Sequence, residues 1–171
     1  MSAIADSRYT TQAAVVADCR AALHARCGDL EAAQRECERF NRAIEAANEP
    51  PIERWPHYIT EFQVLLAADE PEKAASLLER HLDVFDGIVR ARTEACIAIA
   101  RTLHARDDRA PTAYLEHLKQ AFERMRFTGW YGALINLPET LSALCADAIE
   151  AGIESGFCND LIRRRRLSPP P

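Results

Sequence analysis

The sequence contains few glycines, no long apolar run and no recognisable nucleotide-binding motif. With six glycines among 171 residues, it has no G-x-x-x-x-G-K-[ST] loop, so the backbone cradle that holds nucleotide phosphates is missing. Its longest uncharged apolar run, residues 95–100, is far shorter than the roughly 18 residues that a membrane-spanning helix requires. The N-terminus has no charged segment followed by an apolar one, as a secretory signal would. We therefore predict a cytoplasmic chain without membrane association.

The cysteine pattern does not indicate a metal site. The six cysteines include no C-x-x-C pair, which weakens a zinc interpretation. Cys37, Cys96 and Cys145 fall within apolar helical patterns and are expected to be small buried hydrophobes. His24 and Cys27 form the only pair at ligand-compatible helical spacing, and two ligands alone do not hold a metal. We predict no metal and no other cofactor.

Charge and histidine placement give no sign of nucleic-acid binding or catalysis. The chain has 21 basic and 26 acidic residues, a formal net charge of -5, whereas domains that bind nucleic acid through their whole surface are usually basic. A catalytic site needs a nucleophile beside a base, or paired carboxylates in a cleft. His81, His104 and His117 have charged neighbours but no recurring Ser, Cys or Asp partner. We predict that the chain is not an enzyme.

Apolar residues at helical spacing dominate the sequence, of which 48% is hydrophobic. Leu30, Ala33, Cys37, Phe40 and Ile44 follow one another at intervals of 3, 4, 3 and 4, which places all five on one face of a helix. No stretch alternates with the two-residue period of a strand. Glycines and prolines delimit eight expected helices, at about residues 11–26, 29–48, 56–68, 71–86, 88–106, 111–126, 138–151 and 155–166.

Three of the expected turns between helices are similar in sequence. Residues 28–33 align with residues 69–74, and residues 107–113 fit with one extra residue, which gives periods of 41 and 38. Each copy has a small or polar residue in the turn and an acidic residue next, which suits the positive N-terminal end of the following helix. Each also has an early alanine, such as Ala33, which allows two antiparallel helices to approach closely.

These turns resemble those of the tetratricopeptide class, typically Gly-Asp-x-x-x-Ala, over most of residues 12–150. The resemblance implies an all-α, right-handed stack of antiparallel helical hairpins, a solenoid whose groove binds a ligand or partner. The period exceeds the usual length of about 34 residues, and an unrelated helical bundle is the alternative. We expect a disordered N-terminus (1–10), a repeat domain (11–151) and a short helix with a basic, proline-rich tail (152–171).

The C-terminal part contains two distinctive segments, LCADAIEAGIE at residues 144–154 and LIRRRRLSPP at residues 161–170. Together they resemble a segment of large bacterial transcriptional regulators related to the maltose-activator type. Such regulators combine a nucleotide-binding switch, a tetratricopeptide-like sensor and a DNA-binding domain, and the segment resembles the end of the sensor. The resemblance implies a non-catalytic domain for signal sensing or protein interaction, with a protein partner or a small-molecule inducer. DNA would be contacted only through an absent domain. The alternative is a stand-alone scaffold that binds a peptide or protein.

Two aromatic groups are candidates for a binding groove. Trp55, Tyr58 and Phe62 form a stripe at helical spacing, which either packs between repeats or lines the groove of the solenoid. Trp130 and Tyr131 lie between two glycines and either close the end of the array or line the groove.

The strongest charge run is the arginine series Arg163, Arg164, Arg165 and Arg166. Three interpretations compete. The run could be solvated charge at a helix C-terminus, where cations are stabilising. It could dock an adjacent domain or an acidic partner. It could instead contact phosphate directly, although four charges neutralise only a few phosphates.

Overall fold

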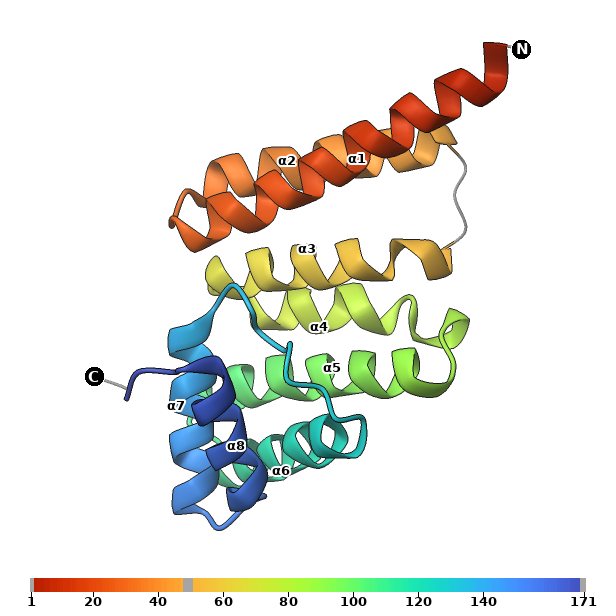
Figure 1. The fold of residues 1–171 in the computed structure, drawn as a ribbon. Coiled ribbons are helices and arrows are strands. Elements are labelled where there is room, and N and C mark those ends of the chain that lie inside the picture. The colour runs from red at the N-terminus through yellow and green to blue at the C-terminus, as the bar shows by residue number, and fades with distance from the viewer. Residues whose placement is uncertain (1, 48–50, 170–171) are drawn as a thin grey trace. The chain divides into compact units, whose positions relative to one another are not determined.

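The computed structural model describes residues 2–47 and 51–169, with side chains described for 12–46 and 53–169. These residues form helices joined by turns and contain no strand, which confirms the predicted all-α class (Figure 1). None of the described helices is long and apolar enough to cross a bilayer. The chain divides into two compact units, 1–69 and 70–171. This boundary falls inside the single repeat domain expected for residues 11–151.

The first unit contains α1 (Ser2–Arg26), α2 (Leu30–Ala47) and α3 (Trp55–Ala67). Helices α1 and α2 lie side by side as an antiparallel hairpin, and α3 packs against both. Helix α1 begins at Ser2, so residues 2–10 are helical where the sequence analysis expected disorder. The expected end of the second helix at residue 48 lies outside the described residues.

Small side chains fill the contact between α1 and α2. Ala33 is fully buried in a cluster with Ala21, Ala25, Cys37 and Val64. Because alanines occupy the interface, the two helix backbones approach closely, as the repeat pattern predicted. A second cluster lies farther along the hairpin and consists of Ala14, Ala17, Phe40 and Ile44.

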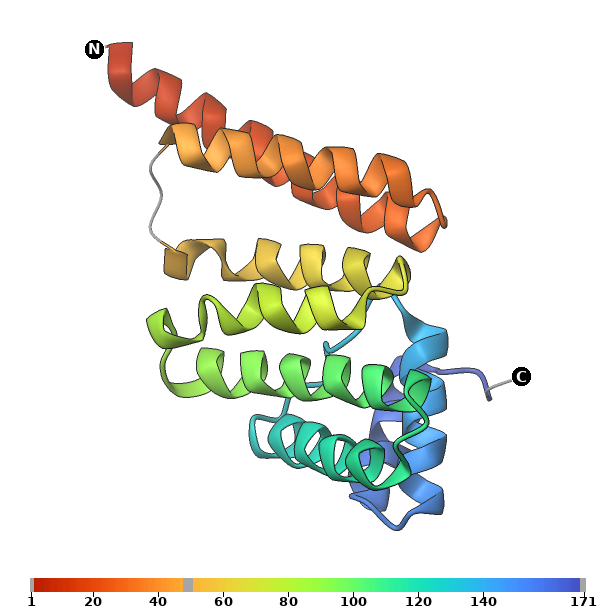
Figure 2. The ribbon, with the colours of Figure 1, turned by 180° about the vertical axis from the view of Figure 1, so that it is seen from behind.

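The described part of the second unit contains five α-helices, and the longest of them, α5, lies between two others (Figure 2). The five are α4 (Pro71–Glu79), α5 (Gly87–Asp107), α6 (Pro111–Phe127), α7 (Pro138–Glu150) and α8 (Ser155–Arg165). Helix α5 packs against α4 and α6, whereas α7 and α8 pack on each other and on α6. Ion pairs of 2.7 Å between Arg101 and Glu79 and of 2.5 Å between Arg124 and Glu94 link α5 to its two neighbours.

Two boundaries in the second unit differ from expectation. Helix α4 ends at Glu79 and is followed by a short 3-10 turn, Leu82–Val84, instead of continuing to residue 86. Helix α8 belongs to the body of the unit, because Cys158 and Leu161 are fully buried. Residues 152–169 are therefore not a separate segment. The predicted burial of cysteines 37, 96 and 145 is confirmed.

Four of the described helix ends have the Schellman motif, in which a left-handed residue follows the last helical turn and two backbone hydrogen bonds close it. At the first of them the N–H of Gly28 donates to the carbonyl of Ala25, and the N–H of Asp29 donates to the carbonyl of His24. The left-handed residues of the four are Gly28, Arg109, Gly129 and Gly152. Asp69 is also left-handed after α3, and its N–H donates to the carbonyl of Leu66.

The positions of the left-handed residues test the alignment of the three similar turns. The left-handed residues Gly28, Asp69 and Arg109 are spaced by 41 and 40 residues (69 minus 28, and 109 minus 69). The third copy therefore aligns at Arg109 without an extra residue, and the expected alignment on Asp107 is wrong by two residues. Burial follows the corrected register, because two sets of equivalent positions are buried in all three copies. These sets are Cys37, Leu78 and Leu118, and then Ile44, Phe85 and Met125.

Candidate ligand-binding groove

A cavity of about 690 Å³ opens in the second unit, where the turn between α5 and α6 lies beside the C-terminal end of α7. This volume falls within the range of about 300–1,000 Å³ that is typical of ligand sites. We call it the α6–α7 groove. Its lining residues are Ala105, Arg106, Arg109, Ala110, Pro111, Tyr114, Leu115, Asp147, Glu150 and Ala151.

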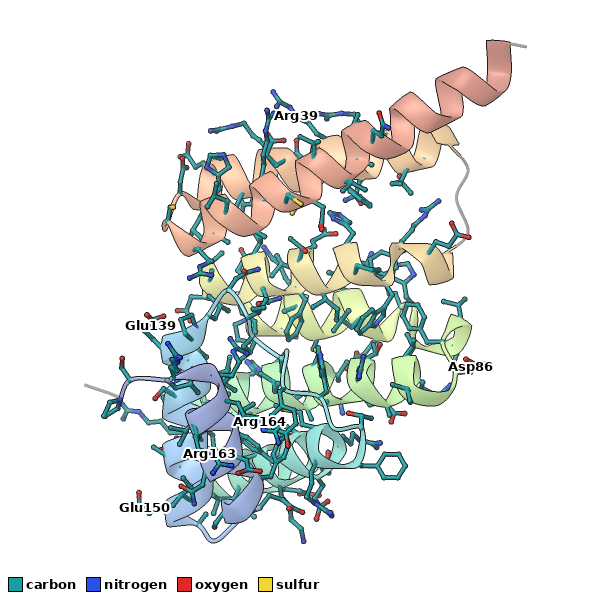
Figure 3. The ribbon with its side chains drawn as sticks, viewed as in Figure 1. Arg39, Asp86, Glu139, Glu150, Arg163 and Arg164 are labelled. Atoms are coloured by element: carbon teal, nitrogen blue, oxygen red, sulfur yellow. The ribbon has the colours of Figure 1, made fainter. Side chains whose placement is uncertain are left out.

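The groove has two charged walls of opposite sign and an apolar floor. On one wall Arg106 belongs to the last turn of α5 and Arg109 to the turn between α5 and α6. On the other wall Asp147 and Glu150 belong to the last turn of α7. Between the walls, small or aliphatic side chains provide apolar surface, including Leu115, which is 43% exposed. In Figure 3, Glu150 lies at the end of α7 opposite to Glu139 and projects outward. Such a groove offers both apolar burial and charge recognition.

Tyr114 occupies the position where the repeat elsewhere has a small residue. In the corrected register it is equivalent to Ala33 and Ala74, which are both fully buried. All three residues are equally placed in the first turn of a helix: Ala33, Ala74 and Tyr114 each donate their N–H to the residue four positions earlier. The larger Tyr114 side chain lines the groove.

The Tyr114 hydroxyl donates a hydrogen bond to the carboxylate of Asp147, which connects α6 to α7 at the groove. Partial burial and this bond to a carboxylate raise the pKa of Tyr114, and the opposite effect of Arg106 is smaller. The tyrosine is therefore a neutral donor at physiological pH, and Asp147 accepts from it. This cross-link fixes one end of the groove.

The N-terminus of α6 lacks the cap that the equivalent helix has. Before α2, the carboxylate of Asp29 accepts a hydrogen bond of 3.1 Å from the N–H of Ala32. Ala110 stands at the equivalent position before α6, where no side chain caps the helix. The first turn of α6 therefore presents its positive end to the groove without a carboxylate of its own.

Most of the charge in the groove is not neutralised within the described residues. Arg109, at the left-handed position, forms no ion pair there, and neither does Glu150. Arg106 has only a long contact of 3.9 Å with its neighbour Asp107. Asp147 is the one charged lining residue with a strong partner, the Tyr114 hydroxyl. Three charged side chains are thus available to a bound molecule.

The predicted aromatic candidates do not line this groove. Tyr58 and Phe62 are buried, Phe62 completely, and Trp55 is half-buried. Burial of this kind corresponds to the packing interpretation of the stripe, since neither ring presents much surface.

The Trp130–Tyr131 pair packs against neighbouring segments of the second unit. The guanidinium of Arg92 lies 5.7 Å from the centre of the Trp130 ring. Gly132 is required beside that ring, because a Cβ there would lie 2.9 Å from Nε1 of Trp130. Tyr131 contacts the ring of Phe157 with a centroid separation of 5.2 Å. These contacts join the loop to α5 and to α8.

The arginine run is partly engaged within the unit. Arg164 lies over the Tyr131 ring at 4.3 Å, and Arg165 donates from one nitrogen to the carbonyls of Tyr131 and Ala133 at 3.0 and 3.2 Å. Arg163 pairs with Asp160 on the surface at 2.6 Å. Arg166 is exposed and ends α8 in a left-handed conformation. The run therefore combines surface charge with two side chains that bind the preceding loop to α8.

A second polar cluster lies in the first unit, around the buried side chain of His57. Its Nδ1 lies 2.8 Å from Asp18, its Nε2 lies 3.7 Å from Glu61, and the ring stacks on Phe40 at 3.5 Å. The histidine links α1, α2 and α3, which is a packing role. Among the described residues no cluster of three or more His, Cys, Asp or Glu side chains could hold a metal ion.

A second, smaller cavity of about 410 Å³ lies between α7, α8 and residues 167–169. It is lined mainly by aliphatic side chains such as Ile149, Ile162 and Leu167. The Ser142 hydroxyl donates to the carbonyl of Ser168 at its edge. Glu150 contributes to this cavity and to the α6–α7 groove.

Sequence reasoning missed the α6–α7 groove. It directed attention to aromatic side chains, whereas the groove is built from alanines, an exposed leucine and charged residues. One signal in the sequence could have found it. In the correct alignment, Arg109, Ala110 and Tyr114 all differ from the residues of the first turn. The first turn has Gly28, Asp29 and Ala33 at these positions. Departures clustered in one turn indicate a specialised copy.

Comparison of the chain with protein-family models, with curated proteins and with solved structures found no match in any of the three. The resemblance to tetratricopeptide repeats and to regulators of the maltose-activator type thus rests on the residues quoted above. The geometry of the groove is the remaining basis for a functional conclusion.

Proposed function

We propose that the chain is a non-catalytic interaction domain of tetratricopeptide-like helical hairpins, which binds a segment of a partner protein in the α6–α7 groove. In this proposal the hairpins form a right-handed stack. The recurrence of the turn at Gly28, Asp69 and Arg109 with matched buried positions supports the repeat. The wider role is that of a sensor region in a bacterial transcriptional regulator, acting in the cytoplasm, with a stand-alone scaffold as the alternative.

The observation that carries the proposal is the composition of the groove. An open cavity of about 690 Å³ combines apolar surface with three charged side chains that have no strong partner. Apolar contact supplies most of the binding free energy in such sites, and a few polar groups fix orientation. A groove that is open at the edge of helix turns suits a peptide segment better than it suits a cofactor, which would have to be enclosed.

A small-molecule inducer is the second candidate, and the cavity volume favours it to a similar degree, because the volume matches that of small-molecule sites. The two candidates differ in what extends beyond the groove. A peptide segment continues on either side, so neighbouring surface residues would also be contacted, whereas a small molecule would leave them free.

Photo-crosslinking at Leu115 tests the proposal. A benzophenone amino acid placed at Leu115, which lines the groove, should form a covalent adduct with a specific protein in the source cells. The matched control is the same substitution at Phe127, which is on the same helix and 81% exposed but outside the groove. An adduct at position 115 alone, lost when Ala151→Trp fills the groove, supports the proposal. Equal adducts at both positions, or none at 115, would contradict it.

A further inference from the structure

The α6–α7 groove is electrically polarised from one wall to the other. On one side Arg106 and Arg109 lie beside the N-terminal end of α6, which carries positive partial charge. On the other side Asp147 and Glu150 lie in the last turn of α7, whose C-terminal end carries negative partial charge. Arg106 also belongs to the last turn of α5, whose C-terminal end carries negative partial charge, so the positive sign of this wall rests on the two guanidinium groups. On the opposite wall the side-chain charge and the helix dipole have the same sign.

The positive wall has no close anionic partner in the described part of the chain. Arg109 forms no ion pair and Arg106 has only the 3.9 Å contact with Asp107. The equivalent turn before α2 carries Asp29, whose carboxylate caps the helix, whereas the turn before α6 has Ala110. A ligand carboxylate placed here would meet two guanidinium groups, and charge-assisted bonds to arginine are among the strongest in proteins.

The negative wall favours a positively charged group of the ligand. Asp147 is satisfied by the Tyr114 hydroxyl, but Glu150 forms no ion pair in the described part of the chain. An acidic group near Glu150 would be repelled, whereas a basic group would be attracted. Between the walls, Leu115 and the floor alanines favour an apolar side chain.

We infer that the groove binds a peptide segment of a partner protein that carries an acidic residue, then an apolar residue, and a basic residue on the far side. The acidic residue pairs with Arg106 and Arg109, the apolar residue covers Leu115, and the basic residue faces Glu150. This inference rests on the proposed function and specifies its ligand. The charge order fixes the orientation in which the segment lies, because a reversed segment would place like charges together on both walls.

A random peptide library displayed on phage, selected on the full chain, tests the inference. Enriched peptides should contain an acidic and a basic residue on either side of an apolar one. For a selected peptide, Arg109→Glu should raise the Kd by about tenfold or more, as expected for the loss of a close charge pair. Exchanging the peptide's acidic residue for lysine should restore binding to the Arg109→Glu variant. Arg42→Glu on α2, which changes the net charge equally, should have no effect.

The groove-filling substitution Ala151→Trp separates the inference from the proposed function. Some selected peptides could lose binding to the Ala151→Trp variant and yet contain no acidic residue, or bind the Arg109→Glu variant with unchanged affinity. Such peptides would overturn the charge assignment but not the proposal that the groove binds a peptide. Peptides that bind Ala151→Trp as well as the native chain, or no enrichment at all, would overturn both. Circular dichroism and thermal unfolding of each variant establish that its fold is intact.

Discussion

The turns before α2 and before α6 have the same backbone conformation, but the side chains around them differ in size and charge. Both use a Schellman motif, with Gly28 in one and Arg109 in the other at the left-handed position. In the first turn Asp29 caps the next helix and Ala33 packs completely. In the later turn the equivalent residues are Ala110 and Tyr114, which line a cavity. The same turn backbone thus supports a closely packed helix pair in one place and lines a cavity in the other.

The difference depends on side-chain size and charge. A helix N-terminus with its own carboxylate is neutralised, whereas one without it retains a positive end that can interact with an external group. Ala33 is fully buried and leaves no space around it. Tyr114 is partly exposed, lines a cavity and donates a hydrogen bond from its hydroxyl. The copy that departs most from the pattern is therefore the one to test for function.

Of the substitutions that test this comparison, Ala33→Leu should change the free energy of unfolding most. Ala33 is fully buried among small side chains, and overpacking such a site typically destabilises a protein by about 1–3 kcal/mol. Tyr114→Leu at the equivalent position should change the free energy of unfolding much less, because the groove has room. Urea denaturation of both variants measures the difference. Equal decreases in the free energy of unfolding would contradict the difference in packing between positions 33 and 114.

Alkaline pH should weaken the first hairpin. Burial raises the pKa of the Cys37 thiol to about 12, with smaller contributions from nearby carboxylates such as Glu61 and Asp18. Because the folded pKa lies above the unfolded one, near 9.0, the stabilisation is present below pH 9 and is lost as the pH rises toward 12. By pH 10 the loss should be about 1 kcal/mol. The Cys37→Ala variant should be less stable but should show a smaller decrease between pH 8 and pH 10.

Exchanging the cap residues should move stability in opposite directions in the two turns. Asp29→Ala should destabilise by about 1 kcal/mol, the usual cost of a lost cap. Ala110→Asp should stabilise by about 0.5 kcal/mol, because the new carboxylate can reach the uncapped N–H groups of α6. It should also weaken peptide binding, since it places an anion next to Arg106 and Arg109. A stabilised variant with unchanged binding would argue against the anion subsite.

Tyr114→Phe should give the smallest effect. It removes the hydrogen bond to Asp147 and leaves the ring in place, so a loss of about 0.5 kcal/mol is expected at this partly exposed site. Thermal unfolding measures the change, and Tyr114→Phe/Asp147→Asn tests whether the two residues act together. Losses that simply add would show that the bond contributes little.

The sequence predicted the helices, the turns and the burial of the first copy, because these depend on local spacing. Leu30, Ala33, Cys37, Phe40 and Ile44 required only a 3.6-residue period, and the structure places all but Leu30, which is partly buried, in the core.

The third copy was misaligned, because the acidic residues of 107–108 imitate the pattern of the first turn. The actual marker is a left-handed backbone at Arg109, which the identity of an arginine does not reveal. The groove was missed because its residues are far apart in the sequence. Its residues come from positions 105–115 and 147–151, and only the packing of α6 on α7 brings them together.

The contacts of Arg165 have a consequence for the order in which the second unit folds. Its hydrogen bonds to the carbonyls of Tyr131 and Ala133 span 34 and 32 residues of chain, whereas α5 and α6 are joined by a short turn. Closing a longer loop costs more entropy and slows assembly. The α5–α6 hairpin should therefore form first and α8 last. In native-state hydrogen exchange, the amides of α8 should open at lower free energy than those of α5.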